Sequence, residues 1–227
     1  MFTKRASYIN LRYSKEPVVI PDRMPLSPRL YHWFVRPPWF TRKYIHSHIN
    51  SHFHLENKIV LDFGSGTGAN CCICKPNSYL GIEPNIKRVD LAKRFYPNHN
   101  FMLFDEKRIP AEDNSIDYIF VIAVLHHLHD GQIKDYLLEF ERVLKPVGKI
   151  IVMEPCLCDQ PTFNNRLMNW YDDGKYIRNE EGYLSLFHAE RYQCEVLKKF
   201  TKCLVYNEIF FSAQREEEGD RKCPKPI

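Results

Sequence analysis

Several features that would assign this chain to a special class of protein are scarce or missing. Only 9 of the 227 residues are glycine, and nothing repeats with a fixed period, so collagen-like and low-complexity sequences are excluded. No apolar run approaches the roughly 18 residues that a membrane-spanning helix needs. The first residues carry charge without the apolar stretch of a secretory signal. We therefore expect a soluble, cytoplasmic protein without a transmembrane segment.

A large excess of charge of one sign is also absent. The chain has 32 Lys and Arg against 28 Asp and Glu, a formal net charge of +4. This is far from the basic excess that by itself announces nucleic-acid binding, which argues against nucleic acid as a partner. The 8 cysteines, in a chain expected to stay in a reducing compartment, predict free thiols.

The cysteines fall into two groups that strands of one sheet could bring to the same edge. Cys71, Cys72 and Cys74 form the first group, and Cys156 and Cys158 form the second. A thiolate metal site is one interpretation. These spacings are not those of a standard zinc site, however, and reduced cysteines commonly fill protein cores. We expect no metal.

The amino-acid composition of the chain changes near residue 57. Residues 1–56 are expected to form an N-terminal arm and a helical lid, because 23–55 contain no Asp or Glu but five Arg and Lys, five His and seven aromatic residues. This segment fits a lid whose rings pack over a site. Contact with a membrane surface, an anionic substrate or a single-stranded nucleic acid stays an alternative. A tail is expected to be disordered over 215–227.

Short apolar strands alternate with helices in the middle of the chain. Such alternation predicts βαβ units and a parallel sheet with ligands at the carboxyl ends of its strands. The expected fold is α/β: a doubly wound, Rossmann-like, mostly parallel seven-stranded sheet with an antiparallel closing strand and helices on both faces. Its core would span 57–214, with a cap insertion at about 156–190. We expect strands at 59–63, 79–82, 101–104, 118–123 and 149–153, helices at 86–95 and 132–144, and an antiparallel pair at 195–202 and 207–214.

The strongest motif is the run VLDFGSGTG, which ends in glycines at 64, 66 and 68. Glycine allows positive φ and lets backbone approach a ligand closely. The spacing G-x-G-x-G differs from the G-x-G-x-x-G that seats a pyrophosphate. Glu83 ends the next expected strand, where a carboxylate can accept both hydroxyls of a ribose. The two features together indicate a site for a ligand that contains a ribose.

These motifs, with the stretch DNSIDYIFVIAVLHHLH at 113–129, resemble the class I S-adenosylmethionine-dependent methyltransferases over roughly residues 58–214. The resemblance is closest to small-molecule enzymes of the ubiquinone, sugar and natural-product type. It implies S-adenosyl-L-methionine as the cofactor and a small-molecule methyl acceptor, with the acceptor atom (O, N or C) left open. Val147 departs from the family by replacing a glycine in the turn before the fifth strand.

The resemblance also implies roles for individual residues. His127 would be a general base for a hydroxyl acceptor, and His126, Trp33 and Arg178 would contact the acceptor. A histidine at a strand end is often only a helix cap or a packed ring, and this alternative stays open. The implied cofactor ligands are Asp62, Gly64, Ser65, Gly66, Glu83, Asp105, Glu106 and Ala123.

Two other functions stay open from the sequence. One is a nucleic-acid or protein methyltransferase that uses the basic, aromatic N-terminal segment to guide a macromolecule, although the chain lacks the Asn/Asp-Pro-Pro-aromatic tetrad of enzymes that methylate amino groups in nucleic acids. The other is a non-catalytic module that binds S-adenosylmethionine without turning it over. Heparin or RNA retention and an acceptor panel would discriminate among them.

Overall fold

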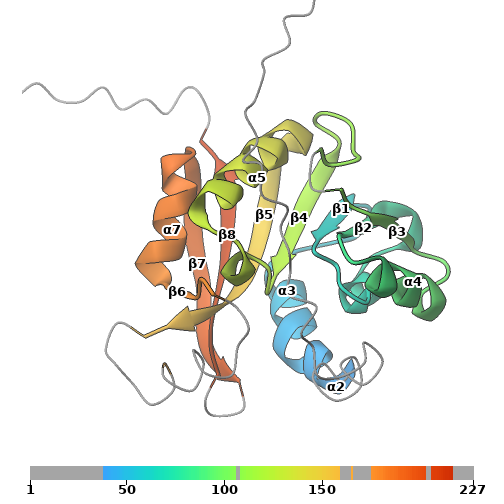
Figure 1. The fold of residues 1–227 in the computed structure, drawn as a ribbon, viewed down its shortest axis with the longest axis horizontal. Helices are drawn as coiled ribbons and strands as arrows, with labels where there is room; N and C mark the ends of the chain where they lie inside the picture. The colour runs from blue at the N-terminus through green and yellow to red at the C-terminus, as the bar shows by residue number, and fades with distance from the viewer. Residues whose placement is uncertain (1–37, 106–107, 159–164, 166–174, 203–205, 217–227) are drawn as a thin grey trace, which may run out of the picture.

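The computed structural model describes residues 38–105, 108–158, 165, 175–202 and 206–216. Within them a single sheet runs through the molecule in the order β3-β2-β1-β4-β5-β8-β7, with β6 paired to β5 off this path (Figure 1). The strands are β1 Val60–Phe63, β2 Tyr79–Glu83, β3 Asn100–Leu103, β4 Ile116–Ile122, β5 Leu144–Leu157, β6 Arg178–Asn179, β7 Tyr192–Lys202 and β8 Tyr206–Arg215.

The sheet confirms the predicted mostly parallel α/β fold. Strands β1 to β5 pair in parallel, and β8 is antiparallel to both of its neighbours, β5 and β7. The antiparallel strand therefore lies one place inside the edge, and β7 forms the edge itself. The short strand β6 is an addition to the predicted seven, and it forms because β5 continues four residues beyond the expected end at Met153.

Helices cover both faces of the sheet, as predicted. On one face α5 and α7 pack against alternate strand residues such as Leu61 and Val121, and on the other face a helical segment before β1 packs with α4 against Val60 and Phe120. The helices are α2 Pro38–Thr41, η1 Arg42–His46, α3 Ser47–His52, η2 Ala69–Ile73, η3 Pro76–Ser78, α4 Ile86–Phe95, η4 Leu125–His127, α5 Asp130–Val143 and α7 Glu180–Ala189.

The helical segment 38–52 corrects part of the predicted lid. Ile45, Ile49 and Phe53 are buried, and they pack in one cluster with Phe120 and Phe210 of the sheet. Burying three large apolar side chains contributes several kcal/mol, so this half of the segment is part of the core rather than a mobile cover. The other half, Trp33 included, lies outside the described residues, and a lid before residue 38 stays a prediction.

The region 156–190, predicted as a cap insertion, includes a core helix. Helix α7 begins with Asn179, whose side chain accepts a hydrogen bond from the backbone N–H of Gly182. Its Tyr183 and Phe187 are fully buried in the cluster that contains α5. The insertion therefore stays a prediction for the residues before α7, most of which lie outside the described part. The same holds for the predicted disordered tail, because the described chain ends with Glu216.

No helix within the described ranges is both long enough and apolar enough to cross a membrane.

Candidate cofactor and active site

The turn after β1 is held in an unusual backbone conformation by its glycines. Gly64, Gly66 and Gly68 have φ of +71°, +56° and +86°, a region that side chains other than glycine rarely adopt. The backbone N–H groups of Gly64 and Ser65 both donate to the carbonyl of Ile82, at 2.9 and 3.0 Å. The end of β2 thus anchors the start of the turn.

The three glycines differ in what surrounds them. A Cβ on Gly64 would lie 2.6 Å from the side chain of Val124, and one on Gly68 would lie 2.6 Å from the ring of Phe101. A Cβ on Gly66 would meet nothing within 4 Å. The outer glycines therefore permit close packing within the protein, whereas the middle one faces open space where the backbone can approach a ligand.

Glu83, at the end of β2, lies directly beside this open space. Its carboxylate accepts hydrogen bonds from the backbone N–H of Gly66 and of Asn85, each at 3.1 Å, and Arg88 lies 3.6 Å away. The side chain is only 2% exposed, and burial raises the pKa of its carboxyl. Because each carboxylate oxygen can accept a second hydrogen bond, the group can still bind two hydroxyls. The residues present thus fit a ribose.

Asp62 supports the turn from below. It is buried in β1, where it accepts a hydrogen bond from the hydroxyl of Tyr79 at 2.6 Å. The side-chain amide of Asn70 donates to both carboxylate oxygens, at 3.4 and 3.3 Å. Asp62 therefore ties β1 to β2 and to η2.

The cysteines that follow the glycine turn lie in and just after η2. Cys71 is fully buried and Cys72 is exposed. A hydrogen bond from the Cys71 thiol lowers the pKa of Cys72 to about 6, and burial adds to the same bond in raising the pKa of Cys71. Among the described residues no group of three His, Cys, Asp or Glu side chains is arranged to hold a metal ion.

Cys72 is expected to be the fastest-reacting thiol among the six cysteines that the structure describes. With a pKa of about 6 it is mostly thiolate at pH 7, and the thiolate is the nucleophile. A maleimide at limiting concentration and pH 7 should label Cys72 first, as located by peptide mass spectrometry. Cys158, which is also exposed, is the comparison thiol. Equal labelling of the two, or a fast phase that persists in Cys72→Ser, would contradict the assignment.

The turn after β4 is organised by one buried carboxylate. Ala123 adopts a positive φ of +57°, a strained conformation for a residue with a Cβ. Glu154 of β5 accepts hydrogen bonds from the backbone N–H groups of Val124, Leu125 and His126, at 2.7, 2.9 and 3.3 Å. It also lies 2.7 Å from Nδ1 of the His126 ring. A carboxylate that is 0% exposed thus satisfies every one of these donors.

A second clamp holds the same turn from β6. The guanidinium of Arg178 donates to the backbone carbonyls of Leu125 and Leu128, at 3.2 and 2.9 Å, and to the carboxylate of Asp130. The backbone N–H of Tyr176 donates to the carbonyl of His126 at 3.0 Å. Arg178, predicted to contact the acceptor, is therefore engaged by the protein and fixes the position of this turn.

The two neighbouring histidines of the turn have different surroundings. His126, also predicted to contact the acceptor, is buried against Glu154, which gives it a positioning role. His127 is half-buried at the end of η4, with its ring centroid 4.0 Å from that of His126. His129 caps helix α5, since its ring accepts a hydrogen bond from the N–H of Gln132. Only His127 remains as a candidate for chemistry on this turn.

The structure thus brings most predicted residues to one edge of the sheet. Asp62, Gly64, Ser65, Gly66 and Glu83 gather at the ends of β1 and β2, and Ala123 and His127 follow β4. Asp105 is exposed after β3. Glu106 and Trp33 lie outside the described residues.

Sequence reasoning missed the role of Glu154. The sequence feature that could have predicted this role is the position of Glu154 directly after the apolar run 150–153, at the carboxyl end of a buried strand. Such a carboxylate has to find several donors, and the turn after the neighbouring strand β4 supplies them.

Comparisons with known proteins agree with this geometry. Residues 61–152 match the family model described as a methyltransferase domain. An uncharacterised methyltransferase of Schizosaccharomyces pombe is 26% identical over 109 residues, which cover 46% of this chain and 42% of that protein. The chain spans less than two thirds of the length of the first curated relatives it matches.

Solved structures share the fold. A SAM-dependent methyltransferase from Aquifex aeolicus has a TM-score of 0.61 at 16% identity, covering 82% of this chain and 98% of that one. Geranyl diphosphate C-methyltransferase from Streptomyces coelicolor, solved with S-adenosyl-L-homocysteine, has a TM-score of 0.58 at 12% identity, covering 77% and 76%. The matching domain, the glycine turn and the buried acid of β2 together support the resemblance to the class I S-adenosylmethionine-dependent methyltransferases, whose fold this chain shares.

Proposed function

We propose that this protein transfers the methyl group of S-adenosylmethionine to a small-molecule acceptor. The observation that carries the proposal is the open space above Gly66, bordered by the buried carboxylate of Glu83. A structural neighbour, the geranyl diphosphate C-methyltransferase, acts on a small molecule by its name. The small net charge of +4 also favours a small acceptor over a nucleic acid.

The residues of this chain would hold the cofactor from two sides. The N–H groups and open backbone of the glycine turn would face its amino-acid end, and Glu83 would accept the ribose hydroxyls. Asp105, and Glu106 outside the described residues, are proposed for the adenine. S-adenosylmethionine supplies, when bound, a methyl group activated by its sulfonium. The protein then has mainly to hold the acceptor in line with that methyl, which is a matter of proximity and orientation.

His127 is proposed as the base for an acceptor that has to lose a proton. It lies on the turn that Glu154 and Arg178 hold rigidly, so its position relative to the ends of β1 and β4 is fixed. A hydroxyl acceptor needs such a base, whereas a neutral amine only has to be held.

Substitution of Gly66 tests the cofactor site. Gly66→Val should leave the fold intact apart from strain of about 1–2 kcal/mol, because no atom lies within 4 Å of the added Cβ but φ is +56°. The affinity for S-adenosylhomocysteine, measured by calorimetry, should fall at least about tenfold, since the side chain fills the space the ligand needs. Gly131→Ala, in α5, is the control and should bind as wild type. Unchanged affinity in Gly66→Val would remove the proposed cofactor site.

The pH dependence of cofactor affinity tests Glu83 separately. Burial raises the pKa of this carboxyl, so its protonation begins at a higher pH than for an ordinary glutamate. Affinity for S-adenosylhomocysteine should therefore fall as pH decreases from 7 towards 5, while Glu83→Gln should bind weakly, by about 5- to 150-fold, and without this dependence. The stability of the free protein should depend on pH in the opposite direction from cofactor affinity. The contribution of Glu83 to the free energy of unfolding is fully present below the pKa of this group in the unfolded chain, and it is lost as the pH rises through the raised pKa in the folded protein. A wild-type affinity that is flat over this range would contradict the role.

A further inference from the structure

The consecutive helices α2, η1 and α3 have one side in the core and one side in solvent (blue in Figure 1). Ile45 and Ile49 are buried on the inner side, whereas Trp39, Arg42 and Lys43 are exposed. Packing on the sheet explains the inner side. It does not explain why the outer side carries exposed cations together with a large exposed ring.

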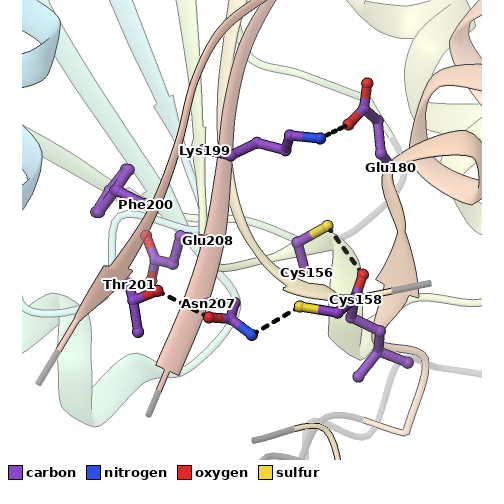
Figure 2. A pocket seen from close by; sticks show the side chains of 9 residues that line it. Cys156, Cys158, Glu180, Lys199, Phe200, Thr201, Asn207 and Glu208 are labelled. Atoms are coloured by element: carbon purple, nitrogen blue, oxygen red, sulfur yellow. Dashed lines mark hydrogen bonds and ion pairs between the residues drawn. The ribbon is translucent and has the colours of Figure 1, made fainter. Parts of the chain in front are cut away.

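This outer side continues onto the hairpin of β7 and β8. The ring centroid of His48 in α3 lies 4.6 Å from that of Phe200 in β7. Side chains alternate along a strand, so Lys198 lies on the same side of β7 as Phe200. Figure 2 shows Phe200 on one side of the hairpin and Lys199 on the other, where it pairs with Glu180. Burial, and after it the charge of Lys198, lowers the pKa of His48, which places this cation beside α3.

The residues of this surface are basic or aromatic, and we call them the α2–α3 face. They are Trp39, Arg42, Lys43, His48, His52 and Lys198. No acidic residue occurs from 38 to 55. Arg42, Lys43 and Lys198 are exposed, and none of them forms an ion pair with another residue in the part of the chain that the structure describes. Their charges are therefore available to a partner.

The acidic residues of the neighbouring hairpin do not neutralise this face. Glu208 is buried and paired with Lys202, so these two residues together add no net charge. Glu195 is exposed on β7, three residues before Lys198, and it offsets one cation at most. The three cations of the α2–α3 face thus keep an excess of positive charge before any histidine is protonated.

Trp39 adds an apolar group to the same face. It is 63% exposed, although its ring meets that of Phe40 edge to face at a centroid distance of 5.8 Å. A tryptophan side chain is favoured at the boundary between lipid and water, because it combines an apolar ring with a polar N–H. Cations beside an exposed tryptophan suit an anionic bilayer, which attracts the charges and accepts the ring at its interface. A nucleic acid is favoured less, since its tight binding requires more phosphate contacts than three cations make.

We propose that the α2–α3 face docks on an anionic membrane surface, with Arg42, Lys43 and Lys198 against the lipid headgroups and Trp39 at the interface. The contact is peripheral and depends on charge, because the apolar side of these helices is already buried in the core. Helix α2 packs against η2, which follows the glycine turn, so docking brings the turn close to the membrane. The proposal does not depend on methyl transfer, since the face lies outside the residues assigned to the cofactor.

Sedimentation of the full chain with lipid vesicles tests this docking. Vesicles of phosphatidylcholine alone are compared with vesicles that contain about 30% phosphatidylserine, at low and at physiological salt. The partition coefficient should be at least about tenfold larger for the anionic vesicles at low salt, and this preference should shrink as salt screens the charges. Equal binding to the two kinds of vesicle, or binding to neither, would overturn the proposal.

Two double variants that remove the same charge locate the contact. Lys43→Gln with Lys198→Gln should lower the partition coefficient at least about tenfold, because each cation near an anionic surface contributes roughly a factor of five. Lys93→Gln with Lys134→Gln removes two exposed cations from α4 and α5, and it should change the coefficient by less than about threefold. Because all four lysines are exposed, both proteins should keep the wild-type Tm and affinity for S-adenosylhomocysteine. Equal loss of binding in the two proteins would show that only net charge matters and would remove the assignment to this face.

Tryptophan fluorescence tests the position of Trp39. Anionic vesicles should shift the emission to shorter wavelength, and a brominated lipid should quench it. The chain also contains Trp33 and Trp170, so the signal of Trp39 is the difference between the wild type and Trp39→Phe. A shift and a quench that persist undiminished in Trp39→Phe would contradict the placement of this ring at the interface.

A single-stranded oligonucleotide tests the other class of anionic partner. At physiological salt it should not displace the protein from anionic vesicles. Displacement that is lost in the Lys43→Gln and Lys198→Gln protein would assign the face to nucleic acid and overturn the membrane proposal. Binding of S-adenosylhomocysteine is measured separately, and its failure would count against the proposed function without changing the result with vesicles.

Discussion

Replacing Glu154 by alanine is expected to lower both the stability and the turnover of this protein more than any other single change at the turn after β4. The carboxylate accepts three backbone N–H groups and lies against the His126 ring, with no exposed surface. Removing it strands buried donors at a cost of about 1–3 kcal/mol each where water cannot replace it. A net loss of about 3 kcal/mol would lower the Tm by roughly 6–12 °C.

Turnover should fall further than stability alone explains. Without Glu154 the turn that carries the strained residue Ala123 and His127 loses its central carboxylate, although Arg178 and Tyr176 still donate hydrogen bonds to it. A displacement of about 1 Å at a reacting group can cost on the order of 10²-fold in rate. The kcat on an acceptor identified from a panel should therefore drop about 10²-fold. The Kd for S-adenosylhomocysteine should rise by less than about tenfold, because Ala123 is disturbed but Glu83 keeps its hydrogen bonds to Gly66 and Asn85.

Two further variants make the Glu154 prediction specific. Glu154→Gln keeps the size of the side chain but replaces one acceptor oxygen by a donor. Its Tm and kcat should therefore lie between those of Glu154→Ala and those of the wild type. Glu195→Ala, at an exposed position of β7, should change stability by no more than about 0.5 kcal/mol. A Glu154→Ala protein with wild-type Tm and kcat would show that the turn does not depend on this carboxylate.

The parts of the fold that were predictable from sequence are those in which local pattern and burial agree. The apolar runs at 60–63 and 79–83 are buried on both faces, and helix α4 starts where Asn85 caps the N–H groups of Lys87 and Arg88. The end of β5 was not predictable in the same way. Its residues beyond Met153 include Pro155, and they extend because they pair with β8 and with the short strand β6.

The residues of the candidate site also fall into those that were predictable from local sequence and those that were not. Gly64, Gly66 and Glu83 were predictable because their chemistry is local: a backbone that needs positive φ, and an acid at the end of a strand. The positioning roles of Arg178 and His126 were not, because each depends on a partner far away in sequence. Arg178 reaches back about 50 residues to Leu128, and His126 reaches forward 28 residues to Glu154. Nothing in the local sequence distinguishes such a side chain from one that faces a ligand.

The segment 38–55 shows why composition alone misleads. Its lack of acidic residues and its many rings are compatible with a cover over a site, with a docking surface or with a core helix. In the described part, the structure shows a core helix, since Ile45 and Ile49 face the sheet at the helical spacing of four residues. The exposed Trp39 lies at the start of this helix and is the described residue that still fits the original interpretation.

Replacing His127 by alanine is expected to reduce turnover on a hydroxyl acceptor by about 10² to 10⁴-fold, the usual contribution of a positioned general base. His127 is half-buried on the clamped turn, next to the strained Ala123 and close to the turn that contains Gly64, since Val124 packs against that glycine. This is where we propose that an acceptor bound at the ends of β4 and β5 meets the cofactor. The affinity for S-adenosylhomocysteine should change by less than about threefold, because most of the implied cofactor ligands lie at the ends of β1 and β2, and the turn that contains Ala123 keeps its hydrogen bonds to Glu154.

A base is distinguished from a packed ring by its pH dependence and by a matched control. The wild-type kcat should rise between about pH 5 and 8, where histidines titrate, and this rise should disappear in His127→Ala. His129→Ala, two residues along the chain, removes the cap of α5 and should cost about 0.5–2 kcal/mol of stability with little effect on kcat. This pair of variants separates loss of chemistry from loss of stability, because the stability effect belongs to His129 and the rate effect to His127. Turnover retained in His127→Ala would assign this ring to packing against His126, at a centroid distance of 4.0 Å, and would favour an acceptor that reacts without losing a proton to the protein.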